Sequence, residues 1–203
     1  MRNDSDSRIR EQVDRLGRPS VGTLNREIAR HERSESYRRV ALGILISLVV
    51  AAAAIVIVTN LWLAVLQVDG SSMNPLLQMN EIVLVARKNN PVRNDIIAFS
   101  HNNKIYIKRV IAVGGSQVEV KEDGTVAVNG RAQNEPHVAD PSRGGCDIAF
   151  PFQVPSGAFF VMGDNRPSSM DSRDSRIGPV TREQIVGKIV FRLWPLSRLG
   201  RVS

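Results

Sequence analysis

The sequence has little cysteine and little histidine, with one Cys, Cys146, and three His among 203 residues. A lone thiol excludes an internal disulfide and a metal cluster built on several cysteines. The sequence also lacks an H-E-x-x-H motif and any cluster of Cys and His, which disfavours metal catalysis. We therefore expect no metal site and no cofactor.

Charged residues are also absent from one long stretch of the chain: residues 40–66 contain no Asp, Glu, Lys or Arg. As a helix rising ~1.5 Å per residue, this run would reach about 40 Å, more than the ~30 Å hydrocarbon core of a bilayer requires. A removable signal peptide fits poorly, because 39 largely polar residues precede the run and the run is too long. A buried helix of a soluble protein is the other alternative. We predict an uncleaved transmembrane helix over residues 40–66.

The charges that flank this run predict its orientation in a cell membrane. Residues 1–39 carry ten Arg and seven acidic residues, with Arg38 and Arg39 next to the run, whereas the first cation beyond it is Arg87. The positive-inside rule then places residues 1–39 in the cytoplasm and residues 67–203 outside, with a single pass between them.

The net charge of +7 is shared by both flanks, because residues 67–203 also hold 17 cations against 13 anions. Such a surplus suits a protein that works against anionic lipid headgroups, so we expect membrane lipids as a partner. No Arg-rich helix or aromatic RNA-binding signature accompanies the charge, and nucleic acid is not expected. Within residues 1–39, the apolar positions Val21, Leu24 and Ile28 follow a Pro19-Ser20 start signal, which leaves a short amphipathic surface helix and a flexible tail both open.

Beyond the apolar run the pattern changes to short stretches rich in β-branched and aromatic residues, separated by turn residues such as Asn and Gly. These stretches predict strands and hairpins over residues 82–86, 96–99, 105–113, 118–120, 126–128, 159–162 and 185–191. Residues 132–157 are richer in Pro, Gly and polar residues and predict a long loop or an abbreviated subdomain. The expected fold class is therefore mostly β after one N-terminal helix.

One lysine in this pattern is a candidate general base. In the stretch IYIKRVIAV, strand alternation places Lys108 on the same face as Tyr106, Val110 and Ala112, which are uncharged. Burial there would disfavour the charged amine and lower its pKa, and a neutral amine can take a proton from a serine hydroxyl. The alternative is that Lys108 extends its ammonium to the rim of the sheet, with Arg109 as a plain surface cation.

Candidate nucleophiles lie just after the apolar run. Ser71 and Ser72 stand between Gly70 and Pro75, where they could be ordinary turn residues or could expose a hydroxyl and a backbone amide near the membrane surface. His101 and His137 are the only histidines beyond the run, and nothing around either one supports a Ser-His-Asp arrangement. We expect a solvated or structural role for both.

A third stretch, GDNRPSSMDSRDSRIG, interrupts the β pattern with residues that can fix one another. Asp171 and Arg173 could pair and stiffen it, and Ser169 could hold the lysine amine in place. An ordinary loop remains the simpler alternative.

Taken in this order after an N-terminal anchor, the three stretches resemble those of bacterial type I signal peptidase, a membrane-bound peptidase with a Ser-Lys dyad. The serine before Met73 in the G-x-S-M-x-P turn, the lysine of the Y-I-K-R-V strand and the G-D-N-x-x-x-S-x-D-S-R box all have counterparts here. The ending FRLWPLSRLG is also similar to that of the shorter, Gram-positive-like members.

The resemblance implies a fold, a reaction and a set of site residues. The fold would be the antiparallel β catalytic domain shared with LexA-like proteases, with a reduced second β subdomain over about residues 115–158. The reaction would be removal of signal peptides from exported preproteins. By resemblance, the site residues are Ser72 as nucleophile, Lys108 as general base, Ser169, Asp171, Arg173 and Asp164 as supporting residues, and Val68, Met73, Tyr106 and Ile107 as walls of the substrate site.

Two other functions are compatible with parts of the sequence. A LexA-like self-cleaving protease would carry a DNA-binding domain and an internal Ala-Gly bond, whereas this chain has an apolar anchor run and no Ala-Gly dipeptide. A catalytically silent, membrane-tethered module that binds exported peptides along a strand edge is the other alternative, and retention of both dyad residues disfavours it.

Overall fold

The computed structural model describes residues 7–12, 17, 21–87 and 90–202. The chain divides into two compact units, Met1–Ile57 and Val58–Ser203. The start signal expected at Pro19-Ser20 lies outside the described residues.

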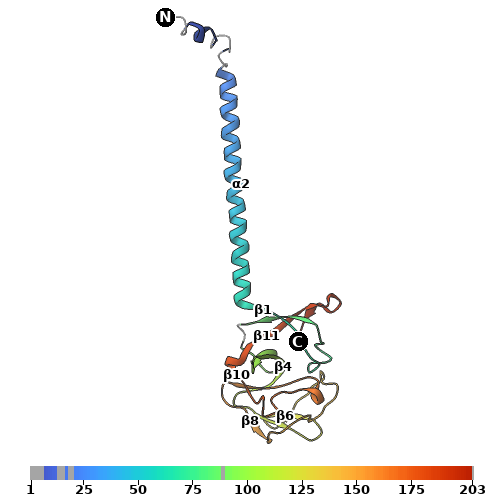
Figure 1. The fold of residues 1–203 in the computed structure, drawn as a ribbon. Coiled ribbons are helices and arrows are strands. Elements are labelled where there is room, and N and C mark those ends of the chain that lie inside the picture. The colour runs from blue at the N-terminus through green and yellow to red at the C-terminus, as the bar shows by residue number, and fades with distance from the viewer. Residues whose placement is uncertain (1–6, 13–16, 18–20, 88–89, 203) are drawn as a thin grey trace. The chain divides into compact units, whose positions relative to one another are not determined.

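The first unit is helical. Residues 7–12 form one short helix, and the helix α2 covers Val21–Trp62 (Figure 1). Residues 21–28, for which a surface helix or a flexible tail was expected, are the first turns of α2. The stretch Tyr37–Ile57 has a mean hydropathy of 3.0, is not buried by the rest of the described chain, and is long and apolar enough to cross a membrane.

The end of this helix differs from the prediction. Helix α2 ends at Trp62, and the strand β1 covers Leu63–Gln67, so the helix expected over residues 40–66 is four residues too long. Each residue of β1 pairs with β2, Ile82–Ala86, in an antiparallel register from Leu63↔Ala86 to Gln67↔Ile82. An uncharged run is compatible with helix and with strand alike, and only the pairing partner separates them.

The second unit contains a large antiparallel sheet. Its strand order is β1-β2-β11-β3-β4-β9-β10, with β12 paired to β11. The further strands are β3 Ile96–His101, β4 Lys104–Val113, β9 Ala158–Met162, β10 Val180–Thr181, β11 Ile185–Trp194 and β12 Gly200–Arg201. The mostly antiparallel β fold expected from the sequence is confirmed.

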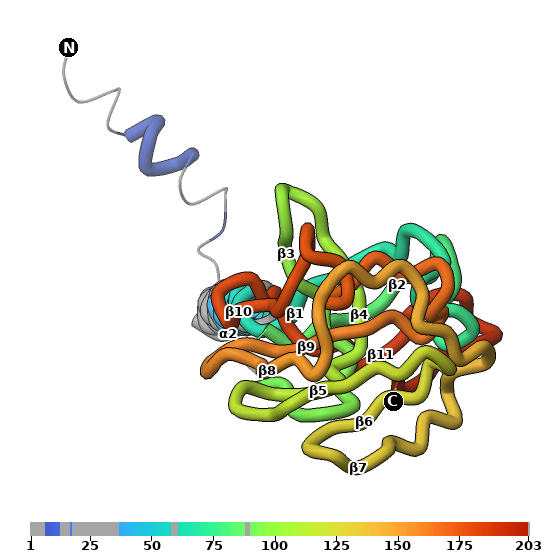
Figure 2. Tube along the Cα trace, turned by 90° about the horizontal axis from the view of Figure 1, so that it is seen from below, coloured from blue at the N-terminus to red at the C-terminus, as the bar shows by residue number. Residues whose placement is uncertain are grey.

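A smaller sheet occupies the segment for which a second subdomain was expected. Its order is β7-β6-β5-β8, and the strands β5, β6 and β7 run side by side in Figure 2. The strands are β5 Gln117–Val120, β6 Val126–Val128, β7 Arg131–Ala132 and β8 Phe152–Gln153. Short 3-10 helices complete the unit: η1 Arg166–Ser168, η2 Arg182–Gln184 and η3 Leu196–Arg198.

The core of this unit lies on both faces of the large sheet. Along β3, alternate residues enter different apolar clusters, with Ile96 and Ala98 in one and Ile97 and Phe99 in the other. The first of these clusters also contains Met73 and Leu77, from the loop that follows β1. The core therefore anchors the segment that carries the candidate serines. A third cluster packs β4 and β9 against the small sheet.

Strand β4 does not keep strict alternation over its whole length. The register between β4 and β9 shifts between Val110 and Ala112, and these two residues belong to different clusters. The expected common face of Tyr106, Val110 and Ala112 therefore holds for Tyr106 and Val110 but not for Ala112. An irregularity of this kind re-aims side chains and leaves no clear signal in a run of apolar residues.

Close packing at the centre of the large sheet predicts a local sensitivity to added volume. A Cβ at Gly187 in β11 would lie 2.8 Å from the Ala86 carbonyl carbon and 2.9 Å from Val85 Cγ1. We expect Gly187→Ala to destabilise the second unit by about 1–3 kcal/mol, because backbone and core must move. Thermal unfolding of the full chain in detergent measures the effect. Gly145→Ala is the matched control, since a Cβ there meets no atom within 4 Å; equal midpoints for the two variants would contradict the prediction.

Candidate active site

The segment between β1 and β2 forms a closed loop, residues 68–81, with Ser72 near its start. The loop is closed at its base by hydrogen bonds from Val68 N to Glu81 O at 2.8 Å and from Asn80 N to Val68 O at 2.9 Å. Gly70 has a φ of +96°, a backbone conformation that side chains with a Cβ rarely adopt. The turn thus requires glycine two residues before Ser72.

Lys108 approaches this loop from the middle of β4. Its side chain is only 3% exposed, and Nζ lies 2.6 Å from Ser72 Oγ in a hydrogen bond between residues 36 positions apart in sequence. The structure therefore selects Ser72 rather than Ser71 as the partner of the lysine. Lys108 is buried, so the alternative in which it extends to the rim of the sheet is not the one observed.

Burial changes the acid–base properties of this amine. The pKa of Lys108 is lowered from 10.5 to about 8, chiefly by desolvation and also by the charge of Arg173, while the negative charges of Asp171 and Asp164 act in the opposite direction. At pH 7 about one amine in ten is then neutral. The ring of Tyr106 lies nearby, with its centroid 6.0 Å from Nζ.

The G-D-N box, residues 163–173, contacts the turn that carries Ser71 and Ser72, which we call the serine turn. Asn165 N donates to Ser72 O at 3.0 Å, and Asn165 Nδ2 donates to Ser71 O at 3.2 Å. A Cβ at Gly163 would lie 2.5 Å from Ser72 O and too close to Ser169 Oγ. Glycine therefore permits the box to approach the serine turn closely, and Asn165 is a contact residue that the sequence analysis did not select.

Asp171 and Arg173 form the pair that the sequence predicted. Both are fully buried, and Arg173 donates from Nε and Nη2 to the two carboxylate oxygens of Asp171, at 2.8 Å each. Asp171 also accepts from Gly163 N at 2.9 Å. Arg173 in addition donates to the carbonyls of Arg143 and Arg166 at 2.7 and 3.0 Å. The pair thus connects the end of the box to Gly163, the first residue of the box, and to Arg143 in the long loop between β7 and β8.

A second buried pair lies beside the lysine. Arg109 donates to Asp164 through Nε and Nη2 at 2.9 and 2.7 Å, and the two side chains are 4% and 1% exposed. Arg109 Nη1 also donates to Asn94 O at 3.0 Å. Arg109 is therefore not the surface cation that the rim alternative supposed. It ties the strand of Lys108 to the box that contains Asp164.

Ser169 lies in the same region, close to Gly163. Its hydroxyl is buried, and it has no hydrogen-bond partner among the described residues. The predicted orienting role of Ser169 therefore stays a prediction.

An open cleft of about 470 Å³ ends at the Ser72–Lys108 pair. Its walls are the end of β1, the serine turn and the first half of β4. All four predicted wall residues line it: Val68, Met73, Tyr106 and Ile107. Strand β9 pairs with β4 only from Arg109 onward, so the half of β4 that lines the cleft has β3 alone as its strand partner.

Arg166 is a buried residue of the box that the sequence analysis missed. It is 1% exposed and donates to both oxygens of Glu135, at 2.7 and 3.0 Å, and from Nε to Gly163 O at 3.0 Å. Glu135 belongs to the long loop between β7 and β8, residues 133–151. A charged residue next to Pro in a polar stretch has no pattern that predicts burial, and its partner lies 31 positions away.

The two histidines of the second unit, His101 and His137, are not part of the cleft lining. His101 packs edge-on against Tyr106, with ring centroids 6.4 Å apart, and His137 Nε2 lies 3.8 Å from Asp164 Oδ1. Within the described part of the chain, no group of three or more His, Cys, Asp or Glu residues comes together as a metal ion would require.

A serine hydroxyl held against a buried amine in an open cleft is an arrangement in which the hydroxyl can act as a nucleophile and the amine as its base. Comparisons with known proteins point to a peptidase. A family model described as signal peptidase, peptidase S26, matches residues 41–194. The signal peptidase I S of Bacillus subtilis (strain 168) is 32% identical over 169 residues, which cover 77% of this chain and 91% of that protein.

Further relatives carry the same description. The signal peptidase IB of Staphylococcus aureus (strain COL) is 36% identical over 173 residues, covering 75% of this chain and 89% of that protein. Among solved structures, a signal peptidase I from Enterococcus faecalis V583 is 32% identical and covers 49% of this chain and 97% of that chain, with a TM-score of 0.40. The chain belongs to the signal peptidase, peptidase S26 family, and it is a peptide-bond hydrolase.

The buried Arg109–Asp164 pair predicts a large loss of stability when one partner is removed. We expect Asp164→Ala to lower the free energy of unfolding by about 3–5 kcal/mol, because the guanidinium of Arg109 then stays buried without its carboxylate. Denaturant unfolding of the full chain in detergent measures it. Arg176→Ala, which removes an exposed partner of Asp174, is the control and should leave the midpoint unchanged. Equal midpoints for the two variants would refute the assignment of Asp164 as a buried anchor.

Proposed function

We propose that this chain is a membrane-anchored serine endopeptidase that removes signal peptides from exported preproteins, with Ser72 as nucleophile and Lys108 as general base. The observation that carries the proposal is the 2.6 Å contact between Ser72 Oγ and a buried lysine amine whose pKa is lowered to about 8. Membership of the signal peptidase family supports the substrate class.

The reaction begins when Lys108 is neutral, because only the neutral amine can accept the hydroxyl proton. Ser72 Oγ attacks the carbonyl carbon of the scissile bond and its proton passes to Lys108 Nζ. The tetrahedral intermediate collapses, the C–N bond breaks, and the protonated Lys108 delivers that proton to the leaving amine. Water then attacks the acyl-enzyme and Lys108 takes its proton; as the ester C–O bond breaks, Lys108 returns that proton to Ser72 Oγ and the peptide acid is released.

The oxyanion of the intermediate needs a hydrogen-bond donor, and we assign this role to the backbone amide of Ser72. Gly70 lines the cleft two residues earlier and contributes no side-chain hydroxyl as a second donor. Stabilisation of the oxyanion here therefore rests on main-chain donors.

The substrate fits as an extended strand. The half of β4 that lines the cleft offers a strand edge, on which a peptide can form main-chain hydrogen bonds, and side-chain pockets then supply the specificity. Val68, Met73, Tyr106 and Ile107 fill the walls beside Ser72, and their bulk leaves shallow pockets that favour small side chains one and three positions before the cut.

The supporting residues act by fixing geometry. Asp164 with Arg109, and Asp171 with Arg173, join β4, the G-D-N box and the long loop through paired charges. We assign to Ser169, buried in the same region, the orientation of the Lys108 amine. Such positioning raises the reaction rate, because a hydroxyl displaced by about 1 Å reacts far more slowly.

The apolar stretch Tyr37–Ile57 supports membrane anchoring. The basic residues before it favour a cytoplasmic N-terminus, with the second unit on the extracytoplasmic side of the cell membrane. The enzyme would then meet preproteins as they emerge from the bilayer, with lipid headgroups beside it.

Substitution of the dyad tests the proposal directly. We expect Ser72→Ala and Lys108→Arg each to lower the processing of a preprotein by at least about 10³-fold, because the first removes the nucleophile and the second replaces the base with a group that stays protonated. The measurement is the appearance of mature protein from a purified preprotein and the full chain in detergent. Ser156→Ala and Lys121→Arg are exposed controls and should process like the wild type.

Each alternative predicts a different result. Equal processing by all variants would remove Ser72 and Lys108 from the mechanism. Preprotein binding without processing by the wild type would favour a silent tether, and cleavage of the chain itself with no cleavage of preprotein would favour a LexA-like self-cleaving protease.

The lowered pKa of Lys108 predicts the pH dependence of the rate. Below about pH 8 most of the amine is protonated, so kcat/KM should rise about tenfold per pH unit and level off above that value. Initial rates between pH 5 and 10 measure the profile, with circular dichroism to show that the fold is kept. A profile that is flat between pH 6 and 9 would exclude Lys108 as a base with this pKa.

A further inference from the structure

Three charged residues that the proposed mechanism does not use come together at the second half of the loop of residues 68–81. Glu81, at the end of the loop, is 3% exposed. Arg198 of η3 donates from Nη1 to Glu81 Oε1 at 2.6 Å, and Arg192 Nε of β11 lies 2.9 Å from Glu81 Oε2. We refer to Glu81, Arg192 and Arg198 as the loop clamp.

The clamp also binds the backbone of the loop. Arg192 Nη2 donates to Leu76 O at 2.6 Å, and Arg198 Nη2 donates to Leu76 O at 3.2 Å and to Pro75 O at 3.3 Å. These carbonyls lie three and four residues after Ser72. A guanidinium is needed here, because its planar fork can bind the carboxylate with one nitrogen and the carbonyls with another, and an ammonium cannot span both.

Burial makes the three charges depend on one another. A buried carboxylate without a partner would be costly. Glu81 is stabilised by two guanidinium groups, those of Arg192 and Arg198, one beside each carboxylate oxygen. In return the carboxylate accepts a hydrogen bond from Arg198 and holds the guanidinium of Arg192 by an ion pair. Removal of either Glu81 or Arg198 therefore disturbs the same contacts with Pro75 and Leu76.

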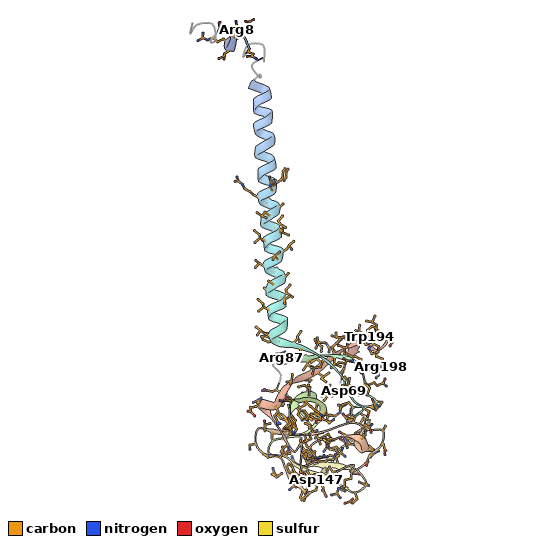
Figure 3. The ribbon with its side chains drawn as sticks, in the orientation of Figure 1. Arg8, Asp69, Arg87, Asp147, Trp194 and Arg198 are labelled. Carbon is orange, nitrogen blue, oxygen red and sulfur yellow. The ribbon has the colours of Figure 1, made fainter. Side chains whose placement is uncertain are left out.

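The serine turn is thus held from two sides. Asn165 binds the carbonyls of Ser71 and Ser72, and the clamp binds the carbonyls of Pro75 and Leu76. None of the three clamp residues is part of the cleft lining. Arg198 lies on the same side of the second unit as Asp69, which lines the cleft, whereas Asp147 lies at the opposite end (Figure 3).

We propose that Glu81, Arg192 and Arg198 are positioning residues that hold the loop of residues 68–81 so that the Ser72 hydroxyl stays within reach of Lys108. This inference rests on the proposed role of Ser72 as nucleophile. The clamp acts through the loop and touches no substrate, so its loss should reduce kcat far more than it changes KM.

The test compares Arg198→Ala with Arg201→Ala in the full chain in detergent, using one preprotein as substrate. Arg201 is an exposed arginine in the adjacent strand β12 and serves as the matched control. We expect Arg198→Ala to lower kcat about 10- to 100-fold, with KM within about threefold of the wild type, because displacement of the nucleophile by a fraction of an ångström to about 1 Å has this effect. Arg201→Ala should match the wild type.

Rescue separates positioning from a general loss of structure. Arg198 is 33% exposed, so guanidinium ion from solution can enter the space that Arg198→Ala leaves beside Glu81. Guanidinium chloride at about 20 mM should restore kcat of this variant at least about threefold, whereas sodium chloride at equal ionic strength should not. Arg198→Lys keeps the charge but loses the fork, and its kcat should stay well below that of the wild type.

A double-variant cycle tests whether Glu81 and Arg198 act as one unit. Glu81→Gln should lower kcat like Arg198→Ala, and the combined variant should be no slower than the slower single variant. Glu183→Gln, at an exposed glutamate in η2, is the control for the charge change.

The outcomes distinguish this inference from the proposed function. Activity in Ser72→Ala would overturn the proposed function and the inference together. An inactive Ser72→Ala with wild-type kcat in Arg198→Ala and Glu81→Gln would overturn the clamp alone. The clamp also fails if guanidinium gives no rescue, if Arg198→Lys matches the wild type, or if the effects of the two substitutions multiply.

Discussion

The burial of one lysine amine against one serine hydroxyl is the interaction on which the rest of the site depends. Lowering the pKa of Lys108 from 10.5 to about 8 corresponds to about 3 kcal/mol in favour of the neutral amine. That shift needs a dry environment, and the middle of β4, paired with β3, supplies it because Lys108 is buried there. The same dryness requires that every other charge nearby be paired, since an unpaired buried charge would be costly.

Paired charges accordingly surround the dyad and connect distant parts of the chain. Arg109 with Asp164, Arg173 with Asp171, and Arg166 with Glu135 join β4, the G-D-N box and the long loop between β7 and β8. These pairs are more than stabilising contacts, because each one fixes an element that contacts Ser72 or Lys108. The charge pattern around the site is therefore part of its geometry, and its electrostatic effect on Lys108 is a consequence of that arrangement.

Much of the fold could be predicted because strands in this chain have a clear local signal. The stretches 82–86 and 126–128 match their strands in full, and the others differ by a few residues at the ends. The prediction was wrong at residues 63–66, where an uncharged run continues from helix into strand. The shift in register between β4 and β9 was also not predicted, because it leaves no signal in the sequence of β4. Both features depend on pairing with strands distant in sequence, which local periodicity does not record.

The sequence by itself determined the family boxes, the apolar stretch before them and the choice of Ser72 and Lys108 as candidates, because each is carried by a short motif or by composition. Only the tertiary structure decided that the amine reaches the hydroxyl, that Arg109 is buried, and that Arg166 and Glu81 have the partners they have. The physical reason is that a charged side chain can be buried at low cost only where an oppositely charged partner lies beside it. These partners come from 31 to 117 positions away, a separation at which a single sequence carries no signal of contact.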